Sequence, residues 1–221
     1  MSSEPGVFEI MYQLRAMRRL KPDPVPDELI WEILEAGTKA PSGSNSQVWR
    51  FVVVRDPDGK RFVQERYKRA WDLYAQANIE AAAKSPPPPE ELPARLRMAR
   101  AAMQMAEHLH EAPVLLLVCM MPRADLPAVR GRRSPAALYA SIFPAVQNIL
   151  LAARALGLGS VLTTLHLVYE DEIKQRFGIP AEVETVALLP IGYPRGKFGP
   201  TTRRPVEEVT YWEKWGERRP R

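Results

Sequence analysis

Cysteine and histidine are scarce in this sequence of 221 residues, which contains one cysteine and three histidines. Cys119 cannot form an internal disulfide, and it lies in an apolar run where a buried and unreactive thiol is expected, because burial raises the pKa of a thiol. His108 and His110 are two residues apart, so they do not share a helix face, and they form no metal-ligating set with His166. We therefore predict no metal site and expect a cytoplasmic protein.

Long apolar stretches and a targeting segment are also missing. The stretch 135–153 has no formal charge, but it contains serine, proline, glutamine and asparagine. These residues fit a buried helix better than a membrane span, which needs about 20 predominantly apolar residues. Residues 2–4 are polar and acidic, unlike the start of a signal peptide. We expect neither a membrane partner nor a secretory signal.

Positive charge is in excess, with a net charge of +5. This excess is compatible with nucleic acid, an anionic surface, a phosphate-bearing ligand or ordinary surface charge. No aromatic side chains alternate with the basic residues as a single-strand binding surface would need, and no zinc-finger spacing is present. We therefore expect no nucleic-acid partner. The basic residues form two clusters near opposite ends of the sequence: Arg15, Arg18, Arg19 and Lys21, and Arg195, Lys197, Arg203 and Arg204.

A hydrophobic content of 46% is enough for a core, and the length fits one domain over residues 1–221. Apolar periodicity and turn residues locate the elements. Residues Asp56–Gly59 predict a turn, and the charged, helical range of about 60–110 predicts an excursion over the core. The predicted helices are about Val7–Met17, 27–37, 60–83, Glu91–His110, Ser134–Leu156 and Glu170–Phe177, and the predicted strands are Phe51–Val54, Val114–Met121, Ser160–Thr164 and Val183–Ile191.

Two features predict contact with a second subunit. The range Ser134–Leu156 is apolar on nearly every side, so it predicts the longest helix, buried all round. In a domain of this size, complete burial requires a partner to cover part of the helix. Trp212 and Trp215 lie in a charged C-terminal tail, which predicts that the tail packs on a partner.

The range Ala40–Phe51 is rich in hydroxyl and amide side chains and lies between a predicted helix and a strand. Small polar residues of this kind bury little surface, but they can hydrogen-bond a flat ligand with polar edges. A plain helix-to-strand turn is the structural alternative. This range is the first candidate for a ligand site.

Four segments together resemble the nitroreductase family of FMN-dependent oxidoreductases. They are the basic segment from Arg15 to Pro26, the polar segment Ala40–Phe51, the segment Ala145–Gly159, and Ile191–Pro194 followed by Arg203, Arg204 and Pro205. They occur in the order that the family shows and cover nearly the whole chain. The resemblance implies an α+β sandwich, with a mixed, mainly antiparallel sheet flanked by helices. It also implies an interlocked homodimer with two FMN sites at the interface.

The resemblance assigns roles to individual residues. Arg15 and Arg203 match phosphate ligands of FMN, because a guanidinium matches phosphate oxygens bidentately. Arg18 matches the basic position near the flavin N1–C2 edge, where a positive charge stabilises the reduced flavin. The remaining assignments follow the flavin ring: Pro41, Ser42 and Ser44 along it, Gly43 for close backbone approach, Asn45 at N3–O4, Gln47 across the dimer interface, and Thr163 and Thr164 near N5.

Some positions depart from the family or stay open. Ala16 and Val48 stand where the family often has serine and proline. Arg19 and Arg204 fit either a ligand contact or a solvated surface. His166 fits either the substrate face or a plain loop position.

The implied reaction needs no catalytic side chain, because the flavin carries the hydride. The resemblance implies a ping-pong reaction in which NAD(P)H is the reductant and a nitroaromatic or quinone is the small-molecule acceptor. Two alternatives stay open. One is a protein that binds or stores flavin without turnover, and the other is a specialised enzyme of the same fold that fragments flavin or removes halogens.

Overall fold

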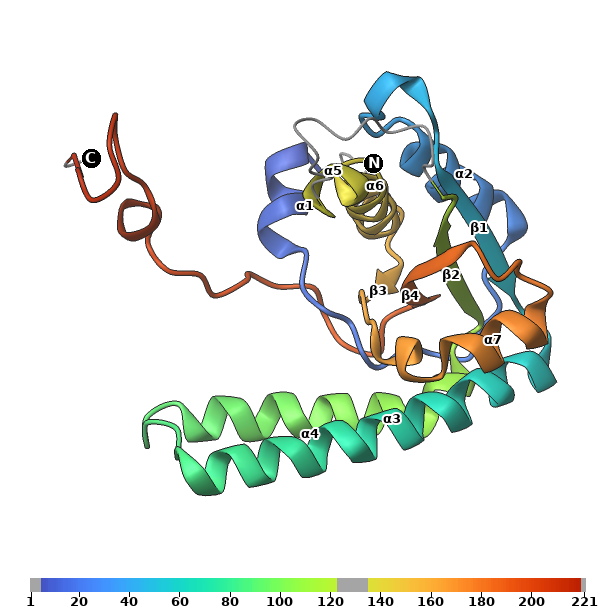
Figure 1. The fold of residues 1–221 in the computed structure, drawn as a ribbon, viewed down its shortest axis with the longest axis horizontal. Helices are drawn as coiled ribbons and strands as arrows, with labels where there is room; N and C mark the ends of the chain where they lie inside the picture. Colours follow the sequence, from blue (N-terminus) through green and yellow to red (C-terminus); the bar gives the residue numbers. More distant parts are fainter. Residues whose placement is uncertain (1–4, 123–134, 220–221) are drawn as a thin grey trace.

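A four-stranded sheet forms the centre of the protein in a computed structural model that describes residues 5–122 and 135–219 (Figure 1). Its order is β1-β2-β4-β3, and every strand pair is antiparallel. The predicted α+β class with a mainly antiparallel sheet is confirmed. The strands are β1 (Trp49–Val54), β2 (Val114–Met120), β3 (Gly159–Ser160) and β4 (Glu184–Gly192).

The strand register defines two ends of the sheet. At one end, Trp49 of β1 pairs with Met120 of β2, which pairs with Glu184 of β4. At the other end, Gly159 of β3 pairs with Gly192 of β4. All seven residues of β2 are buried, as expected for a central strand with apolar residues on both faces.

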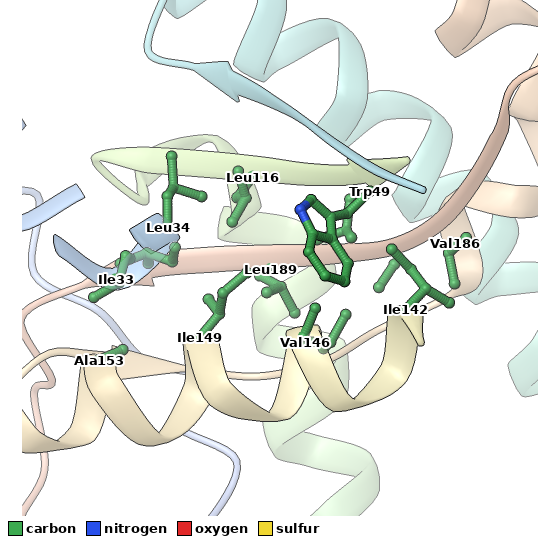
Figure 2. Packing of buried hydrophobic residues seen from close by; sticks show 14 of the residues in the cluster. Ile33, Leu34, Trp49, Leu116, Ile142, Val146, Ile149, Ala153, Val186 and Leu189 are labelled. Carbon is green, nitrogen blue, oxygen red and sulfur yellow. The ribbon is translucent and has the colours of Figure 1, made fainter. Parts of the chain in front are cut away.

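Helices cover both faces of the sheet, so the domain is a sandwich with two apolar layers. On one face, Leu116 and Val118 of β2 pack with α2 (Asp27–Thr38) and α6 (Ile142–Ala155), as Figure 2 shows for Leu116. The opposite face carries the alternate β2 residues, among them Leu115, which pack against α3 (Pro57–Lys84), α4 (Leu92–His108) and α7 (Glu170–Phe177).

A close approach between α2 and α6 depends on Gly37. A Cβ atom placed on Gly37 would lie 2.7 Å from Ile149 Cγ1 of α6, closer than real Cβ contacts allow. Figure 2 shows Ile149 directed from α6 towards Ile33 and Leu34. The glycine therefore permits the packing that forms this apolar layer.

The helix predicted over Ser134–Leu156 is wrong as a single helix. The structure has α5 (Pro135–Tyr139), a break at Ala140 and Ser141, and then α6, while Ser134 lies outside the described residues. Pro144 explains the break, because proline lacks an N–H and is tolerated in the first turn of a helix rather than in its interior. The longest described helix is instead α3, with 28 residues.

Burial of α6 on every side by a second subunit stays a prediction, because the structure describes one chain. The buried residues of α6 face α2 and the sheet, whereas Phe143 is 40% exposed. Phe143 lines an open groove of 640 Å³ together with Met11 of α1 (Val7–Gln13), Leu151 and Leu162.

Helices α3 and α4 form a long hairpin that projects from the sheet (Figure 1). The buried residues of α3 end at Ala70. Asp56 does not form the predicted turn but caps α3, because its Oδ2 accepts a hydrogen bond from the Gly59 N–H at 2.6 Å.

Short helical turns complete the fold. They are η1 (Gly43–Asn45), η2 (Leu109–Glu111), η3 (Leu165–Tyr169) and η4 (Val206–Val209). The C-terminal tail extends away from the sheet (Figure 1), and its Trp215 is 90% exposed. None of the described helices is both long and apolar enough to cross a membrane.

Candidate functional site

Two basic segments from opposite ends of the sequence lie side by side. Thr201 donates its backbone N–H to the Tyr12 carbonyl at 3.0 Å, so the chain that carries Arg203 runs beside the chain that carries Arg15. Arg15 Nη2 donates to the Lys197 carbonyl at 2.7 Å. Among the described residues, no carboxylate pairs with either guanidinium, and both side chains are exposed. This arrangement leaves two planar donor groups available for an anion such as phosphate.

Arg18 lies near a buried polar contact at the β3 edge of the sheet. Tyr67 of α3 is 2% exposed, and its hydroxyl oxygen is 2.7 Å from Thr163 Oγ1. Burial raises the pKa of Tyr67, whereas the Thr163 hydrogen bond and the charge of Arg18 act in the opposite direction. Thr163 exchanges backbone hydrogen bonds of 3.1 and 2.9 Å with Leu188 of β4, and Thr164 beside it is exposed. The structure thus fixes Thr163 firmly on the sheet.

The segment Pro41–Gln47 has an unusual backbone. Ser44, Asn45 and Gln47 have φ angles of 53°, 51° and 46°, in the left-handed region that residues with a Cβ rarely adopt. Among the described residues, Glu213 alone shares this property outside glycine. Such backbone strain costs about 1–3 kcal/mol per residue and is concentrated at binding sites and active sites. Turns also use the left-handed region, which asparagine tolerates, so the plain turn stays open as the alternative for this segment.

Hydrogen bonds hold this strained segment in place. Ser42 Oγ accepts the Gln47 N–H at 2.8 Å, and Gln47 Nε2 donates to Asn45 Oδ1 at 3.3 Å. The Gly43 N–H donates to Ser141 Oγ, just before α6, at 3.1 Å. A Cβ atom on Gly43 would meet nothing closer than Ser141 Oγ at 4.0 Å, so packing within this chain does not require glycine there. Open space above Gly43 is what close approach of a ligand needs.

One chain does not bring the two halves of the predicted site together. Gln47 lies just before Trp49, at the β1 edge and at the end of the sheet marked by Glu184. Arg18 lies just before Leu20, which bridges to Pro194 beyond the other end of β4. Nine-residue β4 spans about 30 Å at roughly 3.3 Å per residue. In Figure 1 the segment before β1 lies at the top of the view, far from β3.

Arg154 of α6 is a candidate that sequence reasoning missed. It is 9% exposed, its Nη2 donates to Gln13 Oε1 at 2.7 Å, and its guanidinium carbon lies 4.0 Å from the centre of the Phe198 ring. Among the described residues it has no carboxylate partner, and its Nε is buried without a hydrogen bond. Gln13 and Phe198 belong to the same two segments that meet at Arg15. Arg154 therefore adds positive charge next to the predicted phosphate site. The sequence contained an indication of this role, because Arg154 is a lone charge in an otherwise apolar helix.

His166 and Cys119 lie inside the protein. His166 is fully buried, so it does not line an open substrate face. Burial lowers the pKa of His166 to about 4, although Glu170 and the Thr185 backbone act in the opposite direction. Burial raises the pKa of the Cys119 thiol to about 11, with a further contribution from Glu170, so the thiol is unreactive at neutral pH, as predicted. Within residues 5–122 and 135–219, no group of three histidine, cysteine or acidic side chains is placed to hold a metal ion.

The residues present fit FMN by their chemistry. Guanidiniums without carboxylate partners match a phosphate, and amide and hydroxyl side chains on a strained backbone match the polar rim of a flat ring. Asn148, in contrast, has a structural role, because its Nδ2 donates to the Ala36 carbonyl of α2 at 3.2 Å.

Comparison with known proteins supports the same reading. A model described as "Nitroreductase family" matches residues 12–193. An NADH dehydrogenase of Thermus thermophilus is 32% identical over 218 residues, which cover 90% of this chain and 91% of that protein. Iodotyrosine deiodinase 1 of Rattus norvegicus is 30% identical over 200 residues, which cover 89% of this chain and 65% of that protein. A crystal structure of iodotyrosine deiodinase bound to FMN and 3-iodo-L-tyrosine has a TM-score of 0.68 and 26% identity, covering 95% of this chain and 99% of that chain.

Proposed function

Because this chain belongs to the nitroreductase family, we propose that it is an FMN-dependent oxidoreductase that transfers a hydride from NAD(P)H to an electron-poor acceptor. Nitroaromatics and quinones are the acceptor classes. The observation that carries the proposal is the meeting of the Arg15 and Arg203 segments, with the buried charge of Arg154 beneath them. FMN, when bound, supplies the hydride chemistry at its N5 atom.

The side chains of this protein bind and orient the cofactor rather than react. Arg15 and Arg203 would hold the phosphate, and Arg18 would supply a positive charge to the pyrimidine edge of the ring. Thr163 and Thr164 would border the ring, and Tyr67 fixes Thr163 by the 2.7 Å hydroxyl contact. No side chain is assigned a catalytic role.

The site is completed by a second copy of the chain. Pro41, Ser42, Gly43, Ser44, Asn45 and Gln47 lie at the opposite end of the sheet from Arg18. In an interlocked homodimer, this loop reaches the flavin held by the partner's arginines. The open groove beside α6 and the exposed tail with Trp212 and Trp215 are the apolar surfaces that such a dimer would cover.

A spectroscopic and kinetic experiment tests the proposal. The purified protein, after reconstitution with FMN, is expected to absorb near the flavin bands and to lose this absorbance when NADH or NADPH is added without oxygen. Addition of a quinone or nitroaromatic then restores the absorbance. Failure to bind FMN contradicts the proposal entirely, whereas FMN binding without reduction by either nucleotide supports the storage protein instead.

Reductive dehalogenation is a second candidate, favoured by the similarity to iodotyrosine deiodinases. It predicts release of iodide from 3-iodo-L-tyrosine by the reduced protein. Absence of iodide release, with intact quinone reduction in the same preparation, rejects this candidate alone.

A further inference from the structure

A separate pocket of 290 Å³ lies between the segment before α2, the C-terminal end of α4 and the end of β4. Pockets for small molecules begin at about 300 Å³, so this volume suits a small organic group rather than a whole dinucleotide. The residues that line it come from distant parts of the sequence: Arg18, Arg19, Leu20, Gln104, Met105, His108, Leu109, Glu111, Ala112, Pro190 and Arg195.

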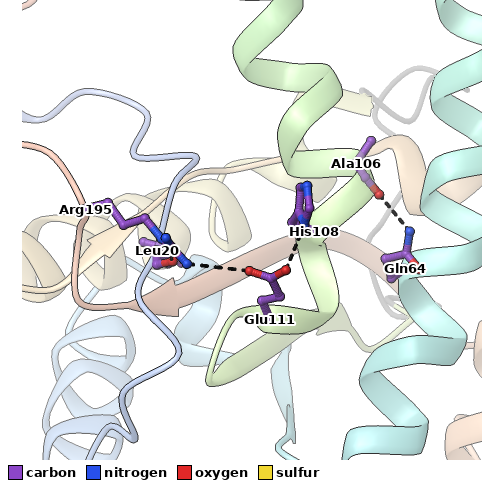
Figure 3. Close-up of polar contacts among 6 residues, drawn as sticks. All are labelled: Leu20, Gln64, Ala106, His108, Glu111 and Arg195. Carbon is purple, nitrogen blue, oxygen red and sulfur yellow. Dashed lines mark hydrogen bonds and ion pairs between the residues drawn. The ribbon is translucent and has the colours of Figure 1, made fainter.

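One wall of the pocket is a connected set of polar groups, shown in Figure 3. Glu111 Oε1 lies 2.8 Å from His108 Nδ1, and Glu111 Oε2 lies 3.6 Å from Arg195 Nη2. Arg195 also donates its Nε–H to the Leu20 carbonyl at 2.9 Å. The single carboxylate of the pocket is therefore already shared between a histidine and an arginine.

The other two arginines of the pocket are not neutralised. In the part of the chain that the structure describes, no ion pair or side-chain hydrogen bond engages the guanidinium of Arg18 or Arg19. Three arginines and one glutamate line the pocket, so its lining carries an excess of positive charge. A partly enclosed site lined by one sign of charge concentrates ligands of the opposite sign.

The floor of the pocket is apolar. Met105 of α4 and Leu109 of η2 are 5% and 2% exposed, and Leu20 is 8% exposed. An inorganic ion would gain nothing from this floor, whereas a ligand with an apolar body and an anionic group would use both surfaces.

We propose that this pocket binds the oxyanion of a small organic molecule, a carboxylate or a phosphate monoester, beside the flavin site. The inference rests on the proposed function, because Arg18 is shared between the pocket and the predicted edge of the flavin. The same chemistry has two sources: an acceptor with a carboxylate, or the 2′-phosphate that distinguishes NADPH from NADH. Arg19 and Arg195 are the arginines of the pocket without an assigned FMN role, and Arg195 is already engaged by Glu111 and the Leu20 carbonyl. Arg19 is therefore the residue to test.

Calorimetric titration of the FMN-loaded protein tests the inference without turnover. The probes are two matched pairs, 4-nitrobenzoate with neutral 4-nitrobenzyl alcohol, and NADP⁺ with NAD⁺. The variants are Arg19→Gln and, as control, Arg97→Gln, which removes an exposed arginine of α4 that does not line the pocket. FMN affinity is measured separately for each variant by quenching of flavin fluorescence.

We expect Arg19→Gln to weaken one anionic probe by roughly tenfold, since a charge-assisted hydrogen bond is lost. FMN and the matched partner that lacks the anionic group should bind as before, and Arg97→Gln should change nothing. Loss of 4-nitrobenzoate affinity identifies an anionic acceptor, and loss of NADP⁺ affinity identifies the nucleotide phosphate. Equal effects on both members of each pair, no effect on any probe, or loss of FMN itself overturns the proposal. If NADH and NADPH do not reduce the flavin but Arg19→Gln still selectively weakens one anionic probe, the proposed function is rejected and the proposed anion site is retained.

Discussion

His166 gives the structure a residue whose protonation opposes folding. The unfolded chain binds a proton at this histidine near the ordinary pKa of 6.5, whereas burial lowers the pKa in the folded protein to about 4. Between these two pH values the unfolded state binds more protons, so the free energy of unfolding falls as the pH falls. The contribution is on the order of 3 kcal/mol when complete, at about 1.4 kcal/mol per pKa unit.

His166→Leu should remove this part of the pH dependence. We expect the urea midpoint of the unmodified protein to fall more between pH 7.5 and pH 5 than that of the variant. Replacing a fully buried ring by leucine also changes the packing, and this changes the stability at every pH. The comparison therefore uses the change of the urea midpoint with pH and not its absolute value. Identical pH dependence in the two proteins would show that His166 is not the titrating group.

The Tyr67–Thr163 contact allows a second test at the scale of single residues. Tyr67→Phe removes a buried hydroxyl and leaves Thr163 Oγ1 without its partner at 2.7 Å. We expect a loss of about 1–2 kcal/mol in the free energy of unfolding, typical of a buried hydrogen bond that loses one partner. A double-mutant cycle with Thr163→Val, measured by urea denaturation, should give a coupling energy near 1 kcal/mol. Additive losses would mean that the two hydroxyls do not interact.

The resemblance to the family named candidate site residues in the sequence, and sequence reasoning missed residues whose importance depends on burial. Arg15 and Arg203 were predicted as phosphate ligands from the family resemblance, and the structure brings their segments together. Tyr67 was missed because a tyrosine in a charged helix gives no sign that its hydroxyl is buried. The burial of His166 was equally hidden, since it depends on packing between segments distant in the sequence.

At the scale of elements, the start of α3 shows how one local pattern fits two structures. Asp-Pro-Asp-Gly is a strong turn signal, yet the same residues form a helix N-terminus, with Asp56 as cap and Pro57 in the first turn. The residues that follow favour the helix over the turn, because Val63, Tyr67 and Ala70 form a helix face that packs on the core. Elements with strong periodicity, such as α7, were predicted at their observed bounds.

Asp56→Ala should therefore destabilise the protein by about 1 kcal/mol, the usual cost of losing an N-cap side chain. Asp58→Ala is the matched control, because Asp58 is in the first turn but is not the cap. We expect its effect to be smaller, limited to the interaction of an exposed carboxylate with the helix dipole. Urea denaturation of both variants measures the difference, and equal losses would argue against capping by Asp56.

The strands show that sequence alone does not predict where a strand ends, because strand length depends on the neighbouring strand. Ser160–Thr164 was predicted as one strand, but β3 contains Gly159 and Ser160 only, and Thr163 forms an isolated bridge to Leu188. Strand length depends on the pairing partner, which β-propensity does not contain. The interruption matters for function, because it exposes Thr164 beside the anchored Thr163.

At the scale of the whole molecule, two features point to a dimer. One chain leaves apolar surfaces exposed, and it does not bring the two halves of the predicted FMN site together. Phe143 and Leu162 line the groove beside α6, and Trp215 is 90% exposed. The strained loop with Asn45 and the basic segment with Arg15 lie at opposite ends of the sheet. In a symmetric dimer, each flavin would use the loop of one chain and the arginines of the other.

Mixing two defective variants tests this arrangement. Arg15→Ala and Asn45→Ala are each expected to lose FMN affinity, by roughly 10-fold or more for the charged contact. When the two variants are unfolded and refolded together, half of the dimers contain one chain of each kind. In such a mixed dimer one site carries both substitutions and the other carries neither, so about one quarter of all sites should bind FMN normally. Gel filtration followed by flavin absorbance measures this fraction. If each FMN is instead held within a single chain, every site keeps one substitution, and the mixture binds no more FMN than the average of the two variants.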